Sequence, residues 1–538
     1  MEQYARYRAP AESGQKLIVP PWSDLGAVAS ANCGWRSRAD IKIGGQSLKD
    51  FAAQARRELV VRASQHVASY HPASARENPA ALIDCSRPLI VTGHQPEMVH
   101  AGVWLKNFAA ASLAKSRNGV ALNLVIDGDA CRSTSIRVPA GTLVEPRFAA
   151  VEFDRPAEKV PWEERSAVDE DSWLSFAERV RAETRELIPE RMLDEWWPAA
   201  IERYHATGRI GASLAQARHL TELAWGPESL ELPQSQMCQT DAFRRFACHL
   251  FQHLPRFVDA YNASLVEYRR VHRIRNHAHP VPNLACQRPW LQAPFWIWCA
   301  ADARRRAVYV RRDSNALILS DLRSFERSLP LAKGGDPASA VAELARWESE
   351  GCKLRSRALI TTMFARLAVA DLFIHGIGGA KYDQATDAIC QRFFGTAPPP
   401  FAAISGTLRL PIAHGNGDDA TIRQLRQSLR ELDYHPERFV GFDRRAPDGN
   451  GAGRHLSEKR RWIDTSKTPQ NAASRHASIT AANHALQPFL VDRRALLESQ
   501  LAAAAQQSRA NRVLSSREYS FCLFPRNLLE QFLLDFPA

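Results

Sequence analysis

Residues 89–129 constrain the fold of this chain more than any other segment. An apolar run at 89–92 predicts a short buried strand, which breaks at a glycine into a loop. A helical pattern follows over 103–116, and a second β-branched run at 122–126 predicts another strand. Strand, helix and strand in this order form a βαβ unit, which requires parallel strands and a right-handed crossover. The segment therefore predicts an α/β fold with a parallel sheet.

Polar and glycine residues follow the two strands of this unit. The carboxyl ends of parallel strands meet at one edge of a sheet, and ligands bind in the crevice outside that edge. We therefore expect the following residues to lie together and form an active site: Gly93, His94, Gln95, His100, Gly102, Asp127 and Asp129.

The histidines and aspartates of this group have more than one interpretation. His94 and His100 can bind a phosphate as imidazolium, or donate a hydrogen bond from a neutral ring, beside the amino terminus of the helix. Asp127 and Asp129 can orient or deprotonate an amine, bind a ribose hydroxyl, or hold a metal. The structural alternatives are loop histidines that bond nearby carbonyls and an Asp-Gly turn with a helix-capping aspartate.

A second strand-to-helix loop lies about 280 positions further along the chain, by the same pattern logic. The sequence predicts a strand at 371–375, a glycine loop, and a helix at about 382–394. Glycines allow a phosphate or ribose to approach the backbone, and a lysine in the loop can neutralise a phosphate, although plain turns use the same residue types. The loop residues that we expect to bind a cofactor are Gly376, Gly378, Gly379, Lys381 and Tyr382.

A third polar group follows a predicted helix, within EYRRVHRIRNHAHPVPNL. Arg275, His277 and His279 can recognise a carboxylate or phosphate through charge-assisted hydrogen bonds, and we expect them to bind substrate. The alternative is a set of solvated cations at the carboxyl end of a helix, where the helix dipole favours positive charge.

Composition limits the class of protein. The chain of 538 residues has 45% hydrophobic and 24% charged residues and no apolar run of membrane-spanning length, so we expect a cytoplasmic globular protein without membrane contact. The net charge is +12, but the basic residues form short scattered groups, which favours anionic small molecules over nucleic acid. Ten cysteines without a C-x-x-C pair indicate reduced, mostly buried thiols, and disfavour a disulfide framework or a zinc site.

The chain is long enough for several structural parts. A further strand is expected near 404–412, and long polar helices at about 419–433 and 471–512, the latter interrupted at Pro488, flank a flexible linker at 443–455. The predicted parts are a helical region (1–84), the first half of the core (85–150), a helical insertion (151–230), the second half of the core with a strand-rich insertion (231–412), a helical hairpin arm (413–512) and a closing segment (513–538).

The segment TGHQPEMVHAGVWLKNFAAASLAK resembles the Gly-Gln-Gln-Pro segment of the bacillithiol biosynthesis cysteine-adding enzyme family. FWIWCAADARRRAVYVRRDSNALIL, RALITTMFARLAVADLFIHGIGGAKYDQATDAICQRFFG and REYSFCLFPRN resemble later segments of that family in the same order. The resemblance covers most of residues 85–538. The family's acidic strand end, E-D-H-D, corresponds here to Asp127-Gly128-Asp129-Ala130, and its G-P-G-E loop to Gly376-Ile377-Gly378-Gly379.

The resemblance implies a Rossmann-like nucleotidylyltransferase core with insertions, and a helical coiled-coil arm that mediates dimerisation. It also implies an amide-forming ligase that adds cysteine to glucosaminyl malate, with ATP or ADP as a candidate cofactor and no assigned metal.

Two other functions remain open on the residues. The first is a Rossmann-like nucleotide-binding transferase with another substrate, which the altered acidic strand end suggests. The second is a basic, non-enzymatic protein that binds RNA or a protein partner through its arm; it predicts nucleic-acid binding that weakens steeply with salt.

Overall fold

The computed structural model describes residues 4–74, 87–413, 415, 419–440 and 451–537. The chain divides into two compact units, which are described separately. The first unit contains residues 1–138, 149–410 and 517–538, and the second contains residues 139–148 and 411–516.

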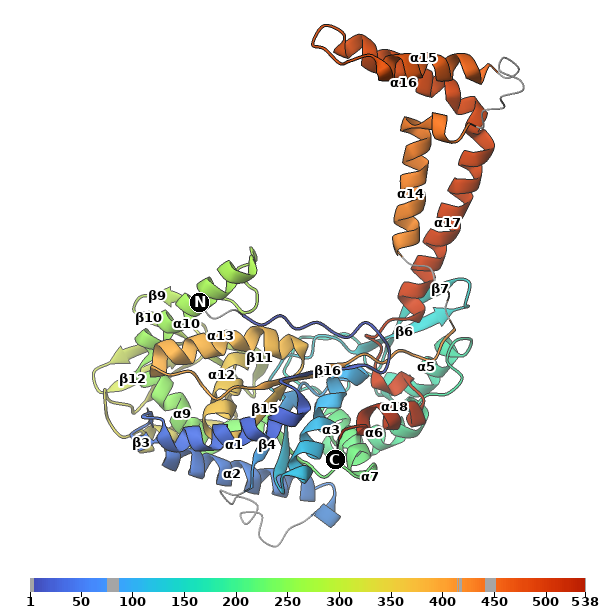
Figure 1. The fold of residues 1–538 in the computed structure, drawn as a ribbon. Helices are drawn as coiled ribbons and strands as arrows, with labels where there is room; N and C mark the ends of the chain where they lie inside the picture. The colour runs from blue at the N-terminus through green and yellow to red at the C-terminus, as the bar shows by residue number, and fades with distance from the viewer. Residues whose placement is uncertain (1–3, 75–86, 414, 416–418, 441–450, 538) are drawn as a thin grey trace. The chain divides into compact units, whose positions relative to one another are not determined.

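A six-stranded sheet forms the centre of the first unit (Figure 1). Its strands, in spatial order, are β1 (Lys16–Val19), β16 (Ala402–Gly406), β15 (Leu372–His375), β4 (Leu89–His94), β5 (Val120–Val125) and β8 (Leu230–Pro233). All neighbours pair in parallel except β1, which is antiparallel to β16. The fold is therefore α/β with a parallel sheet, as the sequence predicted.

The central βαβ unit agrees with the sequence analysis. β4 and β5 are the two predicted strands, and α3 (Ala101–Ser116) is the helix between them. β5 is buried along its whole length, as its β-branched, apolar composition predicts. From β4 the chain goes to β5 and β8 on one side, and later to β15 and β16 on the other. Successive strands of the chain are thus added first on one side of β4 and then on the other. We call this the reversal of strand addition, and it lies between β4 and β15.

The second predicted loop differs from its prediction. The helix after β15, α13 (Ile377–Phe394), begins five residues earlier than expected, because Gly376 is its amino-terminal cap and Gly378 and Gly379 form its first turn. Glycine is tolerated there because the first amide groups of a helix have no intrahelical partner in any case. What the sequence suggested as a glycine loop is the start of a helix.

The buried carboxylate of Asp371 fixes the register between β15 and β4. Its two oxygens accept from Arg36 Nη1 at 2.8 Å, from Arg56 Nη1 at 2.9 Å and from the backbone amide of Leu89 at 2.7 Å. The side chain of Asp371 is 1% exposed, and its amide donates to the carbonyl of Leu89. Asp371 therefore ties two helices to the starts of the two central strands.

The helices of the first unit agree in outline with the predicted helical regions. The predicted helical region, 1–84, contains α1 and α2, but the strand β1 precedes them. The helices not yet named are α1 (Trp22–Arg38), α2 (Leu48–Ala68), α4 (Glu170–Leu174), α5 (Phe176–Thr184), α6 (Leu193–Thr207), α7 (Ile210–Ala224), α8 (Gln234–Cys238), α9 (Asp241–Gln252), α10 (Leu254–His272), α11 (Ala338–Ser349), α12 (Ala358–Phe364), which continues as a π-helical turn (Ala365–Val369), and α18 (Arg526–Leu534).

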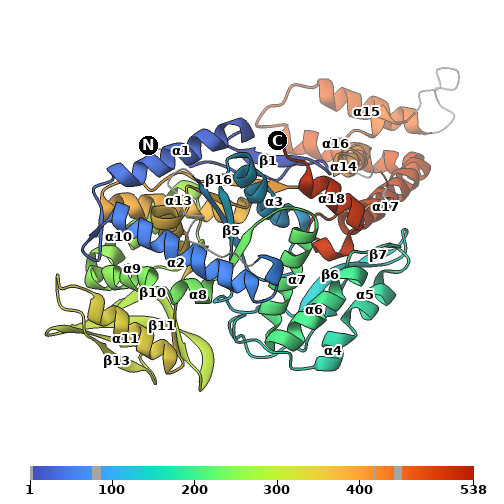
Figure 2. The ribbon, with the colours of Figure 1, turned by 90° about the horizontal axis from the view of Figure 1, so that it is seen from below.

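A second, antiparallel sheet lies between α10 and α12 in the sequence (Figure 2). Its strands, in spatial order, are β13 (Glu326–Leu329), β12 (Ala316–Ser320), β11 (Asp302–Asp313), β10 (Trp290–Cys299) and β14 (Cys352–Ser356), and β9 (Cys286–Gln287) pairs with β10. A two-residue turn with Ser314 at φ 47° joins β11 to β12. Two short hairpins complete the strands: β2 (Lys42–Ile43) with β3 (Gln46–Ser47), and β6 (Ser135–Gly141) with β7 (Pro146–Glu152).

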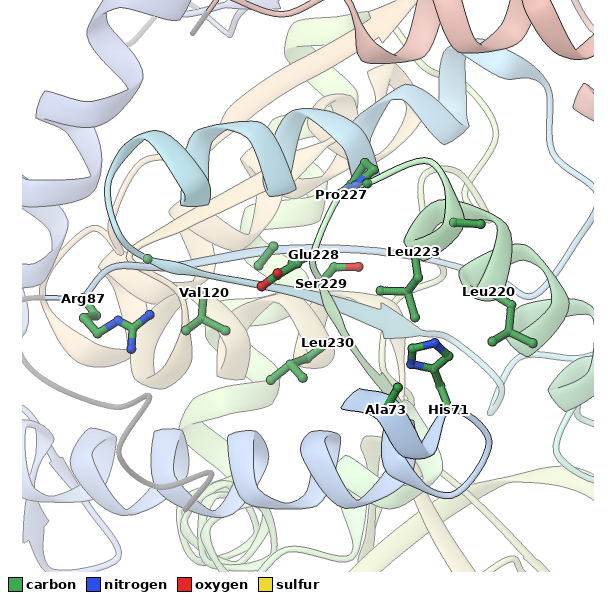
Figure 3. A pocket seen from close by; sticks show the side chains of 14 residues that line it. His71, Ala73, Arg87, Val120, Leu220, Leu223, Pro227, Glu228, Ser229 and Leu230 are labelled. Atoms are coloured by element: carbon green, nitrogen blue, oxygen red, sulfur yellow. The ribbon is translucent and has the colours of Figure 1, made fainter. Parts of the chain in front are cut away.

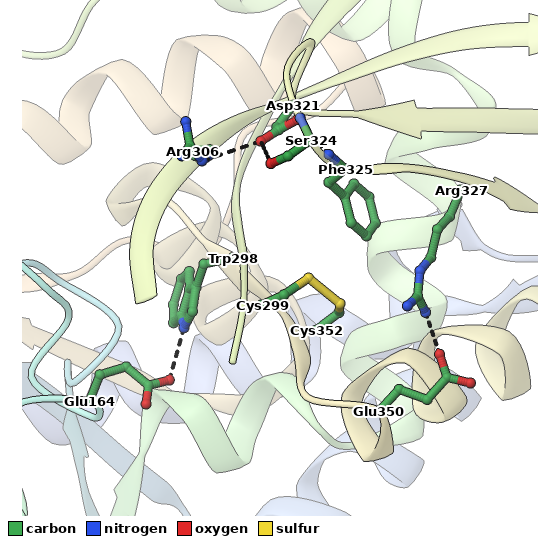
Figure 4. The surroundings of a disulfide bond; sticks show 10 residues. All are labelled: Glu164, Trp298, Cys299, Arg306, Asp321, Ser324, Phe325, Arg327, Glu350 and Cys352. Atoms are coloured by element: carbon green, nitrogen blue, oxygen red, sulfur yellow. Dashed lines mark hydrogen bonds and ion pairs between the residues drawn. A yellow bond between two sulfur atoms is a disulfide. The ribbon is translucent and has the colours of Figure 1, made fainter. Parts of the chain in front are cut away.

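The expectation that the cysteines are reduced is wrong for one pair. Cys299 of β10 and Cys352 of β14 form a disulfide (Figure 4). The antiparallel register places these residues directly opposite each other, which their separation of 53 residues does not reveal. Next to the disulfide, Trp298 Nε1 and Lys353 Nζ both donate to Glu164 Oε1, so this edge of the second sheet holds the loop that contains Glu164.

The second unit is mainly helical. Its elements are the tip of the β6–β7 hairpin (139–148), α14 (Asp419–Tyr434), a 3₁₀ turn (Pro436–Arg438), α15 (Ala452–Asp464), α16 (Ala472–Leu486), a second 3₁₀ turn (Gln487–Leu490) and α17 (Val491–Leu514). The two long predicted helices are confirmed, with the interruption at Pro488. Most of the predicted linker lies outside the described residues, but α15 begins at Ala452, so its last residues are helical and that part of the prediction is wrong.

No helix among the described residues is both long enough and apolar enough to cross a lipid bilayer.

We expect Gly102→Ala to lower the free energy of unfolding by about 1–3 kcal/mol, because a Cβ on this α3 residue would overlap the carbonyl oxygen of Gly406 in β16. Gly378→Ala is the matched control, since a Cβ there meets no atom within 4 Å and α13 gains a better helix former. Chemical denaturation compares the two variants. A Gly102→Ala variant as stable as the natural protein would contradict the close approach of α3 to β16.

The disulfide yields a second expectation. Reduction should lower stability by about 2–4 kcal/mol, because the bond closes a long loop. The measurement is the melting temperature with and without a reducing agent, and the Cys299→Ser, Cys352→Ser double variant should melt at the lower temperature and be insensitive to the reductant. If the natural protein is insensitive too, the two thiols are not linked.

Candidate functional site

A cavity of about 320 Å³ lies at the carboxyl edge of the parallel sheet. The loop after β4, the end of β15 and the first turn of α13 line it, together with residues that follow β5 and residues of β16. We call it the central cavity. Of the predicted site residues it brings together Gly93, His94, Gln95, His100, Asp129, Gly376, Gly378, Gly379 and Tyr382. Two segments far apart in the sequence thus meet in one place, on either side of the point where strand addition reverses.

Three other predicted residues of these loops do not line the central cavity. Gly102 packs against Gly406 in the first turn of α3. Lys381 is exposed, and its carbonyl accepts from Tyr268. Asp127 is buried and accepts from the amide and the hydroxyl of Ser235 at 2.8 and 2.5 Å, beside a different cavity.

The basic group after α10 also lies away from the central cavity. Arg275, His277 and His279 follow the helix in the segment 273–285 and do not line it. The carbonyls of His277 and His279 accept from Arg269, at 2.7 Å and 2.9 Å. Arg269 thus holds the backbone of this segment, an arrangement that the charged sequence did not indicate.

Two helices begin at the central cavity. His100 caps α3 without a side-chain hydrogen bond, and Gly376, which has no side chain, caps α13. The first amide groups of a helix have no intrahelical partner and carry part of the positive end of the helix dipole. Two such termini beside one cavity favour an anionic ligand group.

Lys106 places a buried amine in the central cavity. Its side chain leaves α3, passes Gly376 and donates to the carbonyl of Gly93 at 2.8 Å. No described carboxylate forms a salt bridge with it. Burial, with a smaller contribution from the charge of Arg218, lowers the pKa of Lys106 to about 7. An anionic ligand would supply the missing counter-charge and favour the protonated amine.

The two predicted histidines are neutral near pH 7. Burial, assisted by the charge of Lys106, lowers the pKa of His94 to about 3, and burial lowers the pKa of His100 to about 4 although Glu518 lies nearby. His94 Nδ1 lies 3.2 Å from the carbonyl of Gln95. Burial therefore favours neutral hydrogen-bonding histidines over imidazolium ions.

Asp129 is held at the rim of the central cavity. Gln95 Nε2 and Arg305 Nη1 each donate to one of its oxygens at 2.8 Å, and Arg305 also donates to the carbonyl of Gly128. The side chain of Asp129 is 35% exposed, so free lone pairs remain accessible to a ligand. A carboxylate in this position can accept a hydrogen bond from a ligand amine or hydroxyl.

His375 is a site residue that the sequence analysis did not single out. It ends β15, lines the central cavity, and its Nε2 lies 2.9 Å from Asp383 Oδ2. Asp383 also accepts from Arg366 and Thr362, and these partners hold its pKa well below the usual range, against the effect of burial. An ionised Asp383 fixes the Nε2–H tautomer, which leaves His375 Nδ1 as an acceptor.

The signal for Lys106 was present in the sequence but weak. α3 is apolar nearly all round, and a lysine within such a helix must lie among buried neighbours. His375 carried no comparable signal, because its role depends on its contact with Asp383, which lies past the first turn of α13.

A larger cavity, about 550 Å³, lies at the opposite edge of the sheet (Figure 3). Val120 at the start of β5 and Leu230 at the start of β8 line it, with Arg87 and Glu228. Ligands of parallel sheets bind at the carboxyl ends of the strands, so the central cavity is the better candidate site. Among the described residues, no group of three or more His, Cys, Asp or Glu side chains is arranged to hold a metal ion.

No protein-family model matches the chain, and no curated protein matches it.

The pKa of Lys106 leads to a pH-dependent stability. Between its folded pKa near 7 and its unfolded pKa of about 10.4, the unfolded state holds more protons, so stability rises with pH by up to about 1.4 kcal/mol per unit. Lys106→Met removes this contribution. In chemical denaturation, the free energy of unfolding of Lys106→Met should exceed that of the natural protein most at about pH 6, and the difference should shrink toward about pH 9. Lys115→Met, at an exposed position of α3, should show no such trend, and a constant difference for Lys106→Met would refute the shift.

Proposed function

We propose that the chain is an amide-forming ligase similar to the bacillithiol biosynthesis cysteine-adding enzymes, and that the central cavity is its active site. The observation that carries the proposal is the meeting of Asp129, the two helix amino termini and the buried amine of Lys106 in one cavity. The reaction would join the carboxyl group of an amino acid, with cysteine as the first candidate, to the amine of an anionic aminosugar conjugate.

The architecture supports this proposal. The parallel strands run in the spatial order β8, β5, β4, β15, β16, which is the order of a Rossmann-like core with β4 as its first strand. A helical insertion precedes β8, a strand-rich insertion precedes β15, and a helical pair, α14 and α17, packs around Leu432, Leu490 and Leu497. We propose that this pair is the coiled-coil arm of the family and a dimer contact.

The residues of the central cavity divide into binding and acid–base roles. The amino termini of α3 and α13, together with Lys106, would bind the anionic part of the substrate. Asp129 would accept a hydrogen bond from the attacking amine and orient it. His375 Nδ1 would take the amine's proton as the new C–N bond forms, and Asp383 would stabilise the imidazolium. The C–O bond of the acyl carbon would break in the same reaction, and its oxygen would leave as water or, where ATP activates the carboxyl group, as phosphate.

A nucleotide-binding transferase acting on another substrate is the second candidate. The strand order favours it, because ligands of such sheets, nucleotides above all, bind where strand addition reverses. ATP or ADP is therefore the cofactor to test. Release of ADP or pyrophosphate from ATP without any amide product would favour this candidate over the ligase.

The test is incubation of the purified full-length protein with glucosaminyl malate and cysteine, with and without ATP, followed by mass spectrometry. We expect a thiol-bearing product whose mass is that of the two substrates less one water. Its absence under every nucleotide condition would exclude this substrate pair.

The variant Lys106→Met should lower kcat/KM about 10- to 100-fold, the usual loss when a hydrogen bond to a charged ligand group is removed. Lys115→Met is the matched control on the same helix, and we expect it to keep full activity, since Lys115 is exposed. Equal activity of the natural protein and Lys106→Met would place the reaction outside the central cavity.

A further inference from the structure

A second cavity, of about 560 Å³, lies beside the carboxyl ends of β5 and β8. Neighbouring residues at and after the end of β5 line different cavities: Ile126 and Asp129 line the central cavity, and Val125 and Asp127 line this one. We call it the lateral cavity. Its polar lining includes Arg62, His66, Gln216 and Gln236. It therefore lies at the ligand-binding edge of the sheet but is not part of the active site proposed above.

The amide of Gln216 is the unusual feature of the lateral cavity. Gln216 belongs to α7 and is 6% exposed, and its Oε1 has no hydrogen-bond partner among the described residues. A buried acceptor without a partner costs about 1–3 kcal/mol, so a ligand group that donates to Oε1 gains that amount.

The charged groups of the lateral cavity are already paired. Arg62 Nη1 donates to Gln239 Oε1 at 3.1 Å, Asp127 accepts from Ser235, and Glu163 accepts from Arg355 at 2.8 and 3.0 Å. Two cations, Arg62 and Arg209, also face two acids, Asp127 and Glu163, and burial raises the pKa of Asp127 to about 7. A neutral ligand suits this balance better than a phosphate.

Other lining groups favour a flat, hydrogen-bonding ligand. Gln236 Nε2 lies 3.1 Å from His66 Nδ1, and burial lowers the pKa of His66 to about 4, so its neutral ring carries a donor on Nε2. Gly211, Ala212 and Ala215 of α7 provide small apolar surface along the same wall. The cavity thus combines an amide, a ring donor and a surface on which a planar ring can lie.

We propose that the lateral cavity binds a nucleoside, with the nucleobase paired to the amide of Gln216. A glutamine amide offers a donor and an acceptor side by side, and it pairs in a bidentate manner with the adjacent donor and acceptor of a base, as it does with adenine. The apolar surface of α7 contacts the face of the base, and the ribose hydroxyls remain available to Asp127. This inference does not depend on the proposed ligase activity.

The experiment is isothermal titration calorimetry of the full-length protein with adenosine, guanosine, cytidine and uridine, and with ribose alone. We expect at least one nucleoside to bind and ribose not to bind. Gln216→Leu should weaken that binding about tenfold, the usual effect of losing a neutral hydrogen-bonding group. Gln65→Leu, at an exposed position on α2, is the matched control and should bind like the natural protein.

Folding and binding effects can be separated. Gln216→Leu replaces a buried amide, whose Oε1 has no partner, with an apolar side chain of similar size, so the melting temperature should not fall. If it does fall, Ala212→Leu, which projects a larger side chain from the cavity wall, should block binding instead. The inference is overturned if no nucleoside binds, if both variants bind like the natural protein, or if ribose binds with the same sensitivity to the variants.

Discussion

The pairing of β15 with β4 is the constraint on which the candidate site depends, and the buried carboxylate of Asp371 holds it. Asp371 joins Arg36 of α1 and Arg56 of α2 to the amide of Leu89, where β4 begins. Removing one partner from such a buried ion pair typically costs about 3–5 kcal/mol, because a charge is left without compensation. A fixed register at the amino ends of the two strands also fixes which residues face each other at their carboxyl ends.

Burial at those carboxyl ends determines the chemistry of the central cavity. The same desolvation keeps His94 neutral and brings the amine of Lys106 close to its titration point, because each loses stabilising water around its charged form. Asp383 remains charged in an equally buried place because Arg366 and His375 compensate it. The cavity therefore contains a lysine without a counter-ion, a condition that an anionic ligand relieves.

Local patterns predicted the local structure well. The apolar runs and the helical period around Gly93 located β4, α3 and β5 within two residues, since these signals depend only on near neighbours. The expectation that Asp127 and Asp129 lie in one site is wrong: they line different cavities, because the chain turns directly after β5. The disulfide and the role of His375 were beyond prediction, since each depends on a register or a partner that one sequence does not encode locally.

The central claim is that the buried, partly neutral Lys106 receives the anionic group of the ligand. Calorimetric titration with pyrophosphate at pH 8, in two buffers of different ionisation enthalpy, measures the protons taken up on binding. The account predicts an uptake of about one proton per bound anion, because the anion raises the pKa of Lys106, and it predicts that Lys106→Met loses this uptake. Binding without proton uptake, or equal uptake in the variant, would contradict the claim.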